Sequence, residues 1–307
     1  MTANTKRGWS LRHKRRLKSW TWFDYVNTLF LILLSAIMIF PLYYTLIVSF
    51  ASYESIISSK LYLWPSSFSL DAYKFIFQGS GDILHSFAIS VFITVAGTAL
   101  SMVVSVGLAY GLCKTKMPGH KAFTVFIIFT MLFDAGTIPY YLTVKALHLI
   151  DTIWVLVIPT AAKAYYIILL RNYMKGIAPE LEESARLDGA NDVQILWHIM
   201  LPVCKPILAT VGLFYAVDKW NEWWHAFMFI VTPDKKPLQL ILREILFNYS
   251  QMMTSSVGAA IMAARRPMYG RSLQMAVVVV ACVPIMCVYP FLQKHFTKGI
   301  MVGSVKG

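Results

Sequence analysis

The amino-acid sequence predicts an all-α integral membrane protein whose chain crosses the bilayer six times. Of its 307 residues, 57% are hydrophobic and only 14% are charged, whereas about a quarter of the residues in an ordinary soluble protein are charged. The apolar residues form long continuous runs, unlike the alternating segments of about 10 residues that build a membrane β-barrel. In this context the net charge of +13 indicates an anionic membrane surface and not a nucleic-acid partner.

Six apolar runs are long enough to cross the membrane as helices, because a helix needs about 20 mostly apolar residues to span the hydrocarbon core. The first run is roughly twice as long as the apolar region of a secretory signal, so we expect it to be retained. The six runs cover residues 26–50, 84–112, 122–141, 152–171, 207–230 and 274–292. With their connections they form one transmembrane domain over residues 26–292.

The distribution of Lys and Arg predicts the orientation, because short cytoplasmic loops are rich in both. Residues 1–25 carry seven of them (Lys6, Arg7, Arg12, Lys14, Arg15, Arg16 and Lys18) and 113–121 carry three. The loops 51–83 and 142–151 carry three between them. We therefore expect a cell-membrane protein with both its basic N-terminal segment 1–25 and its tail 293–307 in the cytoplasm.

The loop 176–206, between the fourth and fifth runs, is polar and should lie in the cytoplasm. Pro179 and the acidic residues after it predict a helix start, and Gly189 predicts a break with a positive φ angle. Asp192 is the expected N-cap of a second helix. The apolar face of that helix consists of Val193, Leu196, Trp197 and Met200. Two short exposed helices of this kind suit docking into a groove of a partner.

The order of residues in this loop resembles a known signature. Glu183-Ser184-Ala185, Asp188-Gly189-Ala190, Ile199 and Leu201-Pro202 resemble the EAA loop, the coupling-helix motif of ABC importer permeases. The family has Ala where this chain has Ser184, which is a small-for-small difference. Trp220-Asn221, Gly136 with Ile138-Pro139, and the end 299–307 resemble the carbohydrate-uptake (maltose-type) branch, and within it permeases for complex oligosaccharides.

The resemblance implies the transmembrane domain of a type I ABC importer, in which this chain forms half of a pathway for oligosaccharides or complex sugars. It also implies a second homologous permease subunit, two ATPase subunits and an extracytoplasmic sugar-binding protein. The chain has no GxxxxGK[ST] phosphate-binding loop. We therefore expect a non-catalytic subunit without a cofactor, with ATP and Mg bound by the partner ATPase. The expected ATPase-coupling residues are Glu182, Glu183, Ser184, Ala185, Asp188, Gly189, Ala190, Leu201 and Pro202.

Charged residues inside the apolar runs predict a polar pathway near the bilayer midplane. At 1.5 Å per residue, Asp134, Lys163 and Asp218 lie at similar depths, where transporters bind substrate. Either these groups contact sugar hydroxyls or acidic groups, or Lys163 forms a structural ion pair with Asp218 or Asp134, which we favour. The candidate pathway residues are Asp134, Lys163, Asp218, Trp220, Asn221 and Glu222. Trp220, Trp223 and Trp224 are either stacking surfaces for sugar rings or an interfacial aromatic belt.

Two other polar features have open interpretations. Asp218, Glu222 and His225 share one helical face, but no second cluster of ligands accompanies them, so we expect no metal site. The outer loop 231–273 holds six Lys and Arg residues, against the charge rule. Its Arg265–Arg266 pair is either solvated or a contact for an acidic binding protein or a uronate-bearing sugar.

Two functions of other classes compete with the importer. An ion-coupled secondary transporter would use Asp134 or Asp218 as a proton carrier, but the sequence lacks the inverted repeat of such proteins. A membrane-embedded enzyme would need a catalytic motif, and neither HExxH, nor GxSxG, nor a paired set of catalytic carboxylates occurs.

Overall fold

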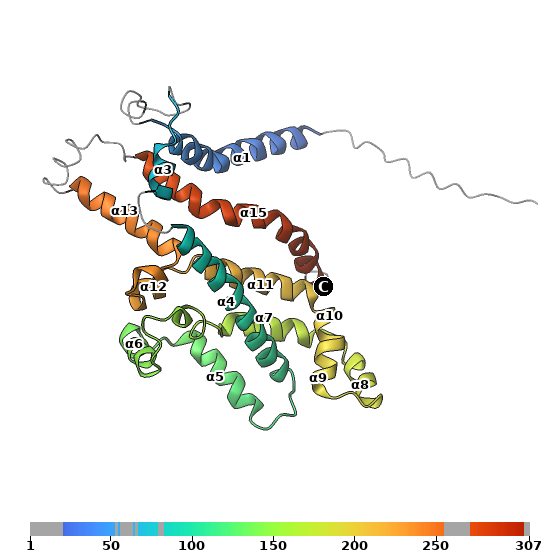
Figure 1. The fold of residues 1–307 in the computed structure, drawn as a ribbon. Helices are drawn as coiled ribbons and strands as arrows, with labels where there is room; N and C mark the ends of the chain where they lie inside the picture. The colour runs from blue at the N-terminus through green and yellow to red at the C-terminus, as the bar shows by residue number, and fades with distance from the viewer. Residues whose placement is uncertain are drawn as a thin grey trace, which may run out of the picture.

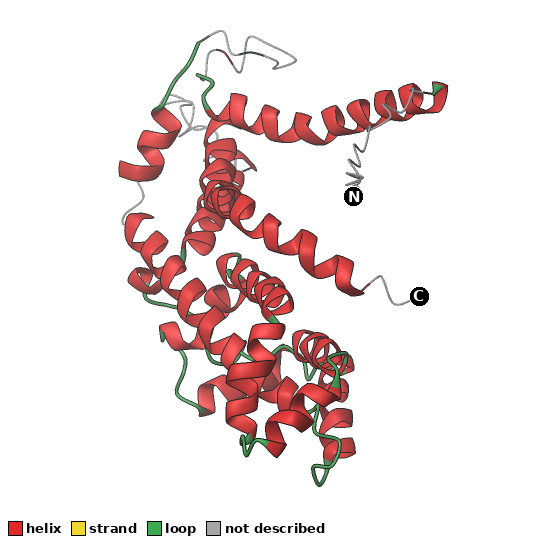
Figure 2. Ribbon diagram, turned by 90° about the vertical axis from the view of Figure 1, so that its right-hand side faces the viewer, coloured by secondary structure: helices red, strands yellow, loops and turns green. Residues whose placement is uncertain are grey.

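The computed structural model describes residues 21–52, 55, 64, 67–78, 83–254 and 271–303, with side chains for all of these except 248–254 and 288–303. The described chain is helical, and an isolated β-bridge between Ala51 and Phe68 forms no sheet (Figure 2). The predicted all-α class is therefore confirmed for these residues. The basic residues from Lys6 to Lys18, the Arg265–Arg266 pair and residues 304–307 lie outside the described residues.

Three long helices coincide with predicted apolar runs. They are α1 (Trp22–Ser49), α4 (Ile83–Gly111) and α15 (Arg271–Gly303). α1 packs along α15 (Figure 1), and most of its side chains are exposed although they are apolar. A large exposed apolar surface of this kind is typical of contact with lipid. The short helix α3 (Asp71–Gln78) precedes α4 and also packs against α15.

The run 122–141 is broken and does not form one straight helix. It contains α5 (His120–Leu132) and α6 (Thr137–Ala146), which are bent by 118° relative to each other. The cause is local, because Gly136 has a φ of 84° and the Asp134 carboxylate accepts a hydrogen bond from its backbone N–H over 2.8 Å. The hydropathy of the sequence does not predict this bend, because the residues on both sides of it are apolar.

Two further runs, 152–171 and 207–230, are broken as well. The first contains the 3₁₀ turn η1 (Ile153–Leu156) and α7 (Ala164–Lys175), and the second contains α11 (Lys205–Trp220) and α12 (Trp224–Phe229). The turn η3 (Pro233–Lys235) and the helix α13 (Leu238–Thr254) follow. Non-helical backbone at membrane depth is tolerated only where protein buries it or where it lines a water-filled cavity. These breaks therefore mark the polar part of the membrane domain.

Among the described helices, two, α1 and α4, are each long and apolar enough to cross a membrane unaided. The number rises to four if each of two bent pairs is one span: α5 with α6, and Asp192–Val203 with α11, which are bent by 86°. The apolar part of α15, Arg271–Cys287, is shorter. The described helices thus support a chain that crosses a membrane more than once, while the count of six stays a prediction.

The centre of the fold is the packing of α4 against α11 and α7 (Figure 1). Small residues of α4, such as Gly97 and Ser105, contact α11, and small residues let membrane helices approach closely. A hydrophobic cluster at the far end of α4 also buries Ala185, Ile195 and Met200 from the loop between α7 and α11. That loop is therefore fixed to the membrane domain.

Candidate functional site

The polar loop folds into two short helices joined by a tight turn, as predicted. α8 covers Pro179–Leu187, and α9 (Asp192–Ile195) continues through one π-helical turn, η2 (Leu196–Met200), into α10 (Leu201–Val203). Gly189 has a φ of 85°, which confirms its predicted role, because side chains with a Cβ disfavour this region.

The N-cap of α9 is Asn191 and not Asp192, which is a correction to the sequence prediction. The Asn191 side chain accepts a hydrogen bond from the backbone N–H of Gln194 over 2.9 Å, and the Gln194 side chain accepts one from the N–H of Asn191 over 2.9 Å. This reciprocal capping box satisfies two backbone donors at once. The side chain of Asp192 does not cap the helix and instead forms ion pairs with Lys114 and Arg186.

The loop has one face packed on its own chain and one face exposed. Ile195 and Met200 are buried, whereas the predicted face residues Val193 and Trp197 are 64% and 65% exposed. Leu187 is 89% exposed. Apolar side chains that are this exposed beside a polar rim are typical of a protein–protein contact.

Four charged side chains fasten the loop to the end of α4. Lys114 forms ion pairs with Glu182 and, over 3.3 Å, with Asp192. Arg186 forms ion pairs with Glu182, over 3.0 Å, and with Asp192. Burial raises the pKa of Glu182, but the hydrogen bonds from Lys114 and Arg186 outweigh it and hold that pKa below its ordinary value. The sequence analysis missed Lys114 and Arg186, and their only signal was charge opposite to the acids of the loop.

Glu183 differs from Glu182, its neighbour on α8. Glu182 forms ion pairs with Lys114 and Arg186. Glu183 is exposed and has no hydrogen bond or ion pair among the described residues. The other predicted coupling residues lie in and around the same turn: Ser184 and Asp188 are exposed, Ala185 is buried, Ala190 and Leu201 are half-buried, and Pro202 is exposed. The structure thus brings the predicted coupling residues into one region.

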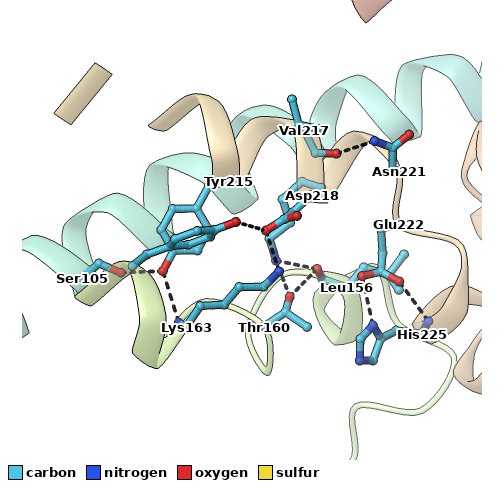
Figure 3. A network of polar contacts seen from close by, with 12 residues as sticks. Ser105, Leu156, Thr160, Lys163, Tyr215, Val217, Asp218, Asn221, Glu222 and His225 are labelled. Atoms are coloured by element: carbon cyan, nitrogen blue, oxygen red, sulfur yellow. Dashed lines mark hydrogen bonds and ion pairs between the residues drawn. The ribbon is translucent and has the colours of Figure 1, made fainter. Parts of the chain in front are cut away.

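Two of the three charges predicted near the midplane, Lys163 and Asp218, lie in a network of polar contacts between the start of α7 and α11 (Figure 3). Lys163 Nζ lies 2.5 Å from Asp218 Oδ2, and Tyr166 donates a hydrogen bond to the same oxygen over 2.9 Å. Of the two predicted partners of Lys163, the structure therefore brings Asp218 to it. Asp134 lies instead in the break between α5 and α6. The side chains of Lys163 and Asp218 are 44% and 34% exposed, so the pair is accessible from one side of this chain.

Lys219 is the most deeply buried charged side chain among the described residues, at 4% exposure. Its ammonium group donates to the backbone oxygens of Leu156 over 2.9 Å and Val157 over 3.3 Å, and to the Thr160 hydroxyl (Figure 3). Leu156 is the last residue of η1, and Val157 and Thr160 lie in the non-helical segment between η1 and α7, where the chain lacks helical donors. Sequence reasoning placed Lys219 inside an apolar run but did not assign it this role.

Tyr215 joins three elements at the same level. Its hydroxyl shares a hydrogen bond of 2.7 Å with Ser105 on α4 and accepts one of 3.2 Å from the backbone N–H of Lys163, at the start of α7 (Figure 3). Tyr215 is fully buried in α11. The network therefore fixes the position of Lys163 relative to α4 and α11.

The remaining predicted pathway residues surround the end of α11. Trp220 is buried and donates its indole N–H to the backbone oxygen of Ala281 over 3.3 Å, so it packs against α15. Asn221 is exposed, and its amide donates to the Val217 oxygen over 2.9 Å. Glu222 accepts a hydrogen bond from the His225 N–H over 2.9 Å. No cluster of three metal-ligating side chains is present in the part of the chain that the structure describes.

Comparison with known proteins gives consistent matches. Residues 122–302 match the model of a family described as "Binding-protein-dependent transport system inner membrane component". The chain is 43% identical over 286 residues to the polygalacturonan/rhamnogalacturonan transport system permease protein YtcP of Bacillus subtilis (strain 168), covering 93% of this chain and 98% of that protein. It is 41% identical to the protein LplC of the same organism, covering 93% and 95%.

A solved structure is also similar. The crystal structure of a bacterial ABC transporter involved in the import of the acidic polysaccharide alginate contains a chain that superimposes with a TM-score of 0.79 at 32% sequence identity. The match covers 89% of this chain and 96% of that chain.

Proposed function

Since the chain belongs to the family of inner-membrane components of binding-protein-dependent transport systems, it is a non-catalytic permease subunit of an ABC importer for sugars, and we propose how it is assembled and driven. It pairs with a second permease subunit, with which it encloses the translocation pathway. The complex contains two ATPase subunits, which bind ATP and Mg, and one of them docks on the cytoplasmic loop of this chain. An extracytoplasmic binding protein delivers the sugar from the opposite side.

We propose six spans with both termini in the cytoplasm. The support is the charge distribution, with ten Lys and Arg residues in 1–25 and 113–121 against three in the outer loops 51–83 and 142–151. The third outer loop, 231–273, holds six and departs from the charge rule. In this topology, α8 and α9 face the cytoplasm, and the chain from η3 through α13 lies at the outer side. The bends at Asp134–Gly136 and after Trp220 lie within two of the six spans.

We propose that the substrate is an oligosaccharide that carries carboxylates. One relative is named for polygalacturonan, a polymer of galacturonic acid, and the solved relative belongs to a transporter for the acidic polysaccharide alginate. The Lys163–Asp218 pair serves as a structural contact between α7 and α11. Asp218 already accepts hydrogen bonds from Lys163 and Tyr166, which does not favour the alternative of a proton-coupled transporter.

One observation carries the coupling part of the proposal: the loop between α7 and α11 is anchored to the membrane domain by Lys114 and Arg186, yet exposes Leu187, Trp197 and Glu183. An anchored element with an exposed apolar and acidic face can transmit a movement of a docked partner to α4, α7 and α11. A free loop cannot do so.

Charge reversal at Glu183 tests this proposal. Because Glu183 is exposed and has no ion pair with any described residue, Glu183→Lys leaves the fold intact and places a positive charge at the docking surface. We expect capture of the ATPase subunit by the detergent-purified permease to fall at least tenfold, or about 1.4 kcal/mol, with Glu183→Gln intermediate. The control Lys116→Glu reverses an exposed cytoplasmic charge outside the loop and should capture within twofold of wild type. Full capture by Glu183→Lys would mean that this face is not the docking surface.

A further inference from the structure

Arg243 is stacked on an aromatic ring at the predicted outer side of the molecule. α12 begins at Trp224, directly after the break that ends α11, and packs beside α13 (Figure 1). From α13, the guanidinium carbon of Arg243 lies 3.4 Å from the centre of the Trp223 ring. A guanidinium group over an aromatic face is held there by electrostatic attraction and dispersion.

The stacking orients Arg243 without using its hydrogen-bond donors. The guanidinium carbon lies 3.4 Å from the ring centre, and at this distance an edge-on guanidinium would drive its nitrogens into the ring. The group must therefore lie flat on the ring, so the N–H donors in its plane stay available for a bidentate contact with a carboxylate. Arg243 is exposed, and among the described residues no acidic side chain forms an ion pair with it.

Neighbouring cations of the domain differ in this respect. Lys163 is paired with Asp218, and Lys219 donates to backbone oxygens. Lys235 lies 3.1 Å from Asp151, and Lys236 lies 2.7 Å from Glu244. Each of these ammonium groups has an acceptor within the chain, whereas Arg243 is oriented by Trp223 and pairs with no acidic side chain of the described residues. Among these five cations, Arg243 is therefore the one that is held in place and available for an anion from outside the chain.

Apolar aromatic surface lies next to this cation. Trp224 is 46% exposed and meets Trp223 edge to face, with ring centres 5.5 Å apart. Phe227 is 60% exposed and its ring centre lies 6.4 Å from that of Trp224. A uronic acid residue has a C–H face that packs on flat aromatic surface and a carboxylate at its edge, so it matches both parts of this arrangement.

The surface is held in place by the adjoining outer loops. Asp151 accepts hydrogen bonds from the backbone N–H groups of Val231 (3.0 Å) and Thr232 (2.9 Å) and from the Thr232 hydroxyl (2.6 Å), just after α12. The Thr232 contacts, with Lys235, hold the pKa of Asp151 well below its ordinary value. Asp151 therefore stays ionised, and α12 is fixed at its far end at any pH near neutrality.

We propose that Arg243 and Trp223, with Trp224 beside them, form a contact site at the outer mouth of the pathway for uronate residues of an oligosaccharide. Arg243 binds the carboxylate, and the tryptophans support the sugar ring. This proposal rests on the proposed function of the chain as a sugar importer subunit. It adds that this chain itself contains a site that favours acidic sugars.

The test is uptake of labelled trigalacturonate by proteoliposomes that contain the whole transporter and its binding protein. We expect Arg243→Gln to reduce the uptake rate at least tenfold and Arg243→Lys to reduce it less, because an ammonium keeps the charge but lacks the planar fork. The matched control is Arg271→Gln, which removes an exposed arginine at the start of α15 that contacts no aromatic ring of the described residues. It should transport within twofold of wild type. ATPase capture and the thermal unfolding midpoint should be unchanged in all three variants.

Three results would contradict the proposal that Arg243 and Trp223 bind uronate residues. These are wild-type uptake by Arg243→Gln, an equal loss in Arg271→Gln, or a wild-type transporter that carries neutral trisaccharides but not trigalacturonate. Each of them leaves ATPase capture intact, so it is distinguishable from a failure of the proposed function, in which the wild-type chain captures no ATPase subunit.

Discussion

Lys219→Met is expected to lower the free energy of unfolding of the purified permease by about 1–3 kcal/mol, the largest loss among the charged positions of the membrane domain. The Lys219 ammonium donates to the backbone oxygens of Leu156 and Val157. The Thr160 hydroxyl also donates to the Leu156 oxygen, over 3.2 Å, so the substitution leaves the Val157 oxygen without a donor among the described residues, and a buried acceptor in that state costs about 1–3 kcal/mol. Removal of a buried charge offsets part of this loss. The measurement is equilibrium unfolding in detergent with a denaturant titration.

The matched control is Lys163→Met. That side chain is 44% exposed, and after its removal Asp218 still accepts a hydrogen bond from Tyr166, so we expect a loss of at most about 1 kcal/mol. The Lys219 side chain also packs closely on Gly97 of α4. A Cβ at Gly97 would lie only 2.9 Å from Cδ and Cε of Lys219, so glycine at this position leaves the room that the lysine needs. Equal losses in the two variants would contradict the account of Lys219 as the donor for the non-helical segment.

Gly189→Val is expected to reduce ATP hydrolysis stimulated by the loaded binding protein at least tenfold. Nothing lies within 4 Å of a Cβ built at Gly189, so the cost is set by its φ of 85°, which is strained for any β-branched residue. The turn between α8 and α9 would then change shape and misplace the exposed face.

Two variants separate this backbone effect from side-chain bulk. Gly189→Asn should keep most of the stimulated hydrolysis, because Asn tolerates the left-handed region. Gly107→Ala should keep it as well, since a Cβ at Gly107 also meets nothing within 4 Å but the residue is helical. Normal hydrolysis by Gly189→Val would show that the conformation of the turn is not required for coupling.

The elements predicted best from the sequence are those determined by local signals. The uninterrupted apolar runs predict both ends of α4 and the end of α1 to within one residue, while α1 begins four residues before the predicted run. The turn at Gly189 is predicted because this residue separates an acidic helix start from an apolar stripe. The N-cap was misplaced by one residue, because Asn191 and Asp192 are both good caps and only the contact with Gln194 distinguishes them.

The features that the sequence did not predict depend on contacts between distant segments. The break at Gly136 was hidden by apolar residues on both sides of it. Asp134 and Asp218 are equally deep in their runs, so depth could not decide which of them pairs with Lys163. Likewise, the stacking of Arg243 on Trp223 joins residues of two elements whose approach is set by tertiary packing.

Site-specific photo-crosslinking in native membranes tests whether the loop from Pro179 to Leu201 docks on an ATPase. A benzoylphenylalanine in place of Leu187, which is 89% exposed on α8, should crosslink to the ATPase subunit on illumination. The same probe in place of Val231, which is 76% exposed at the predicted outer side, should crosslink to no ATPase. An ATPase crosslink from position 231, or its absence at position 187 in a complex that hydrolyses ATP, would contradict the account.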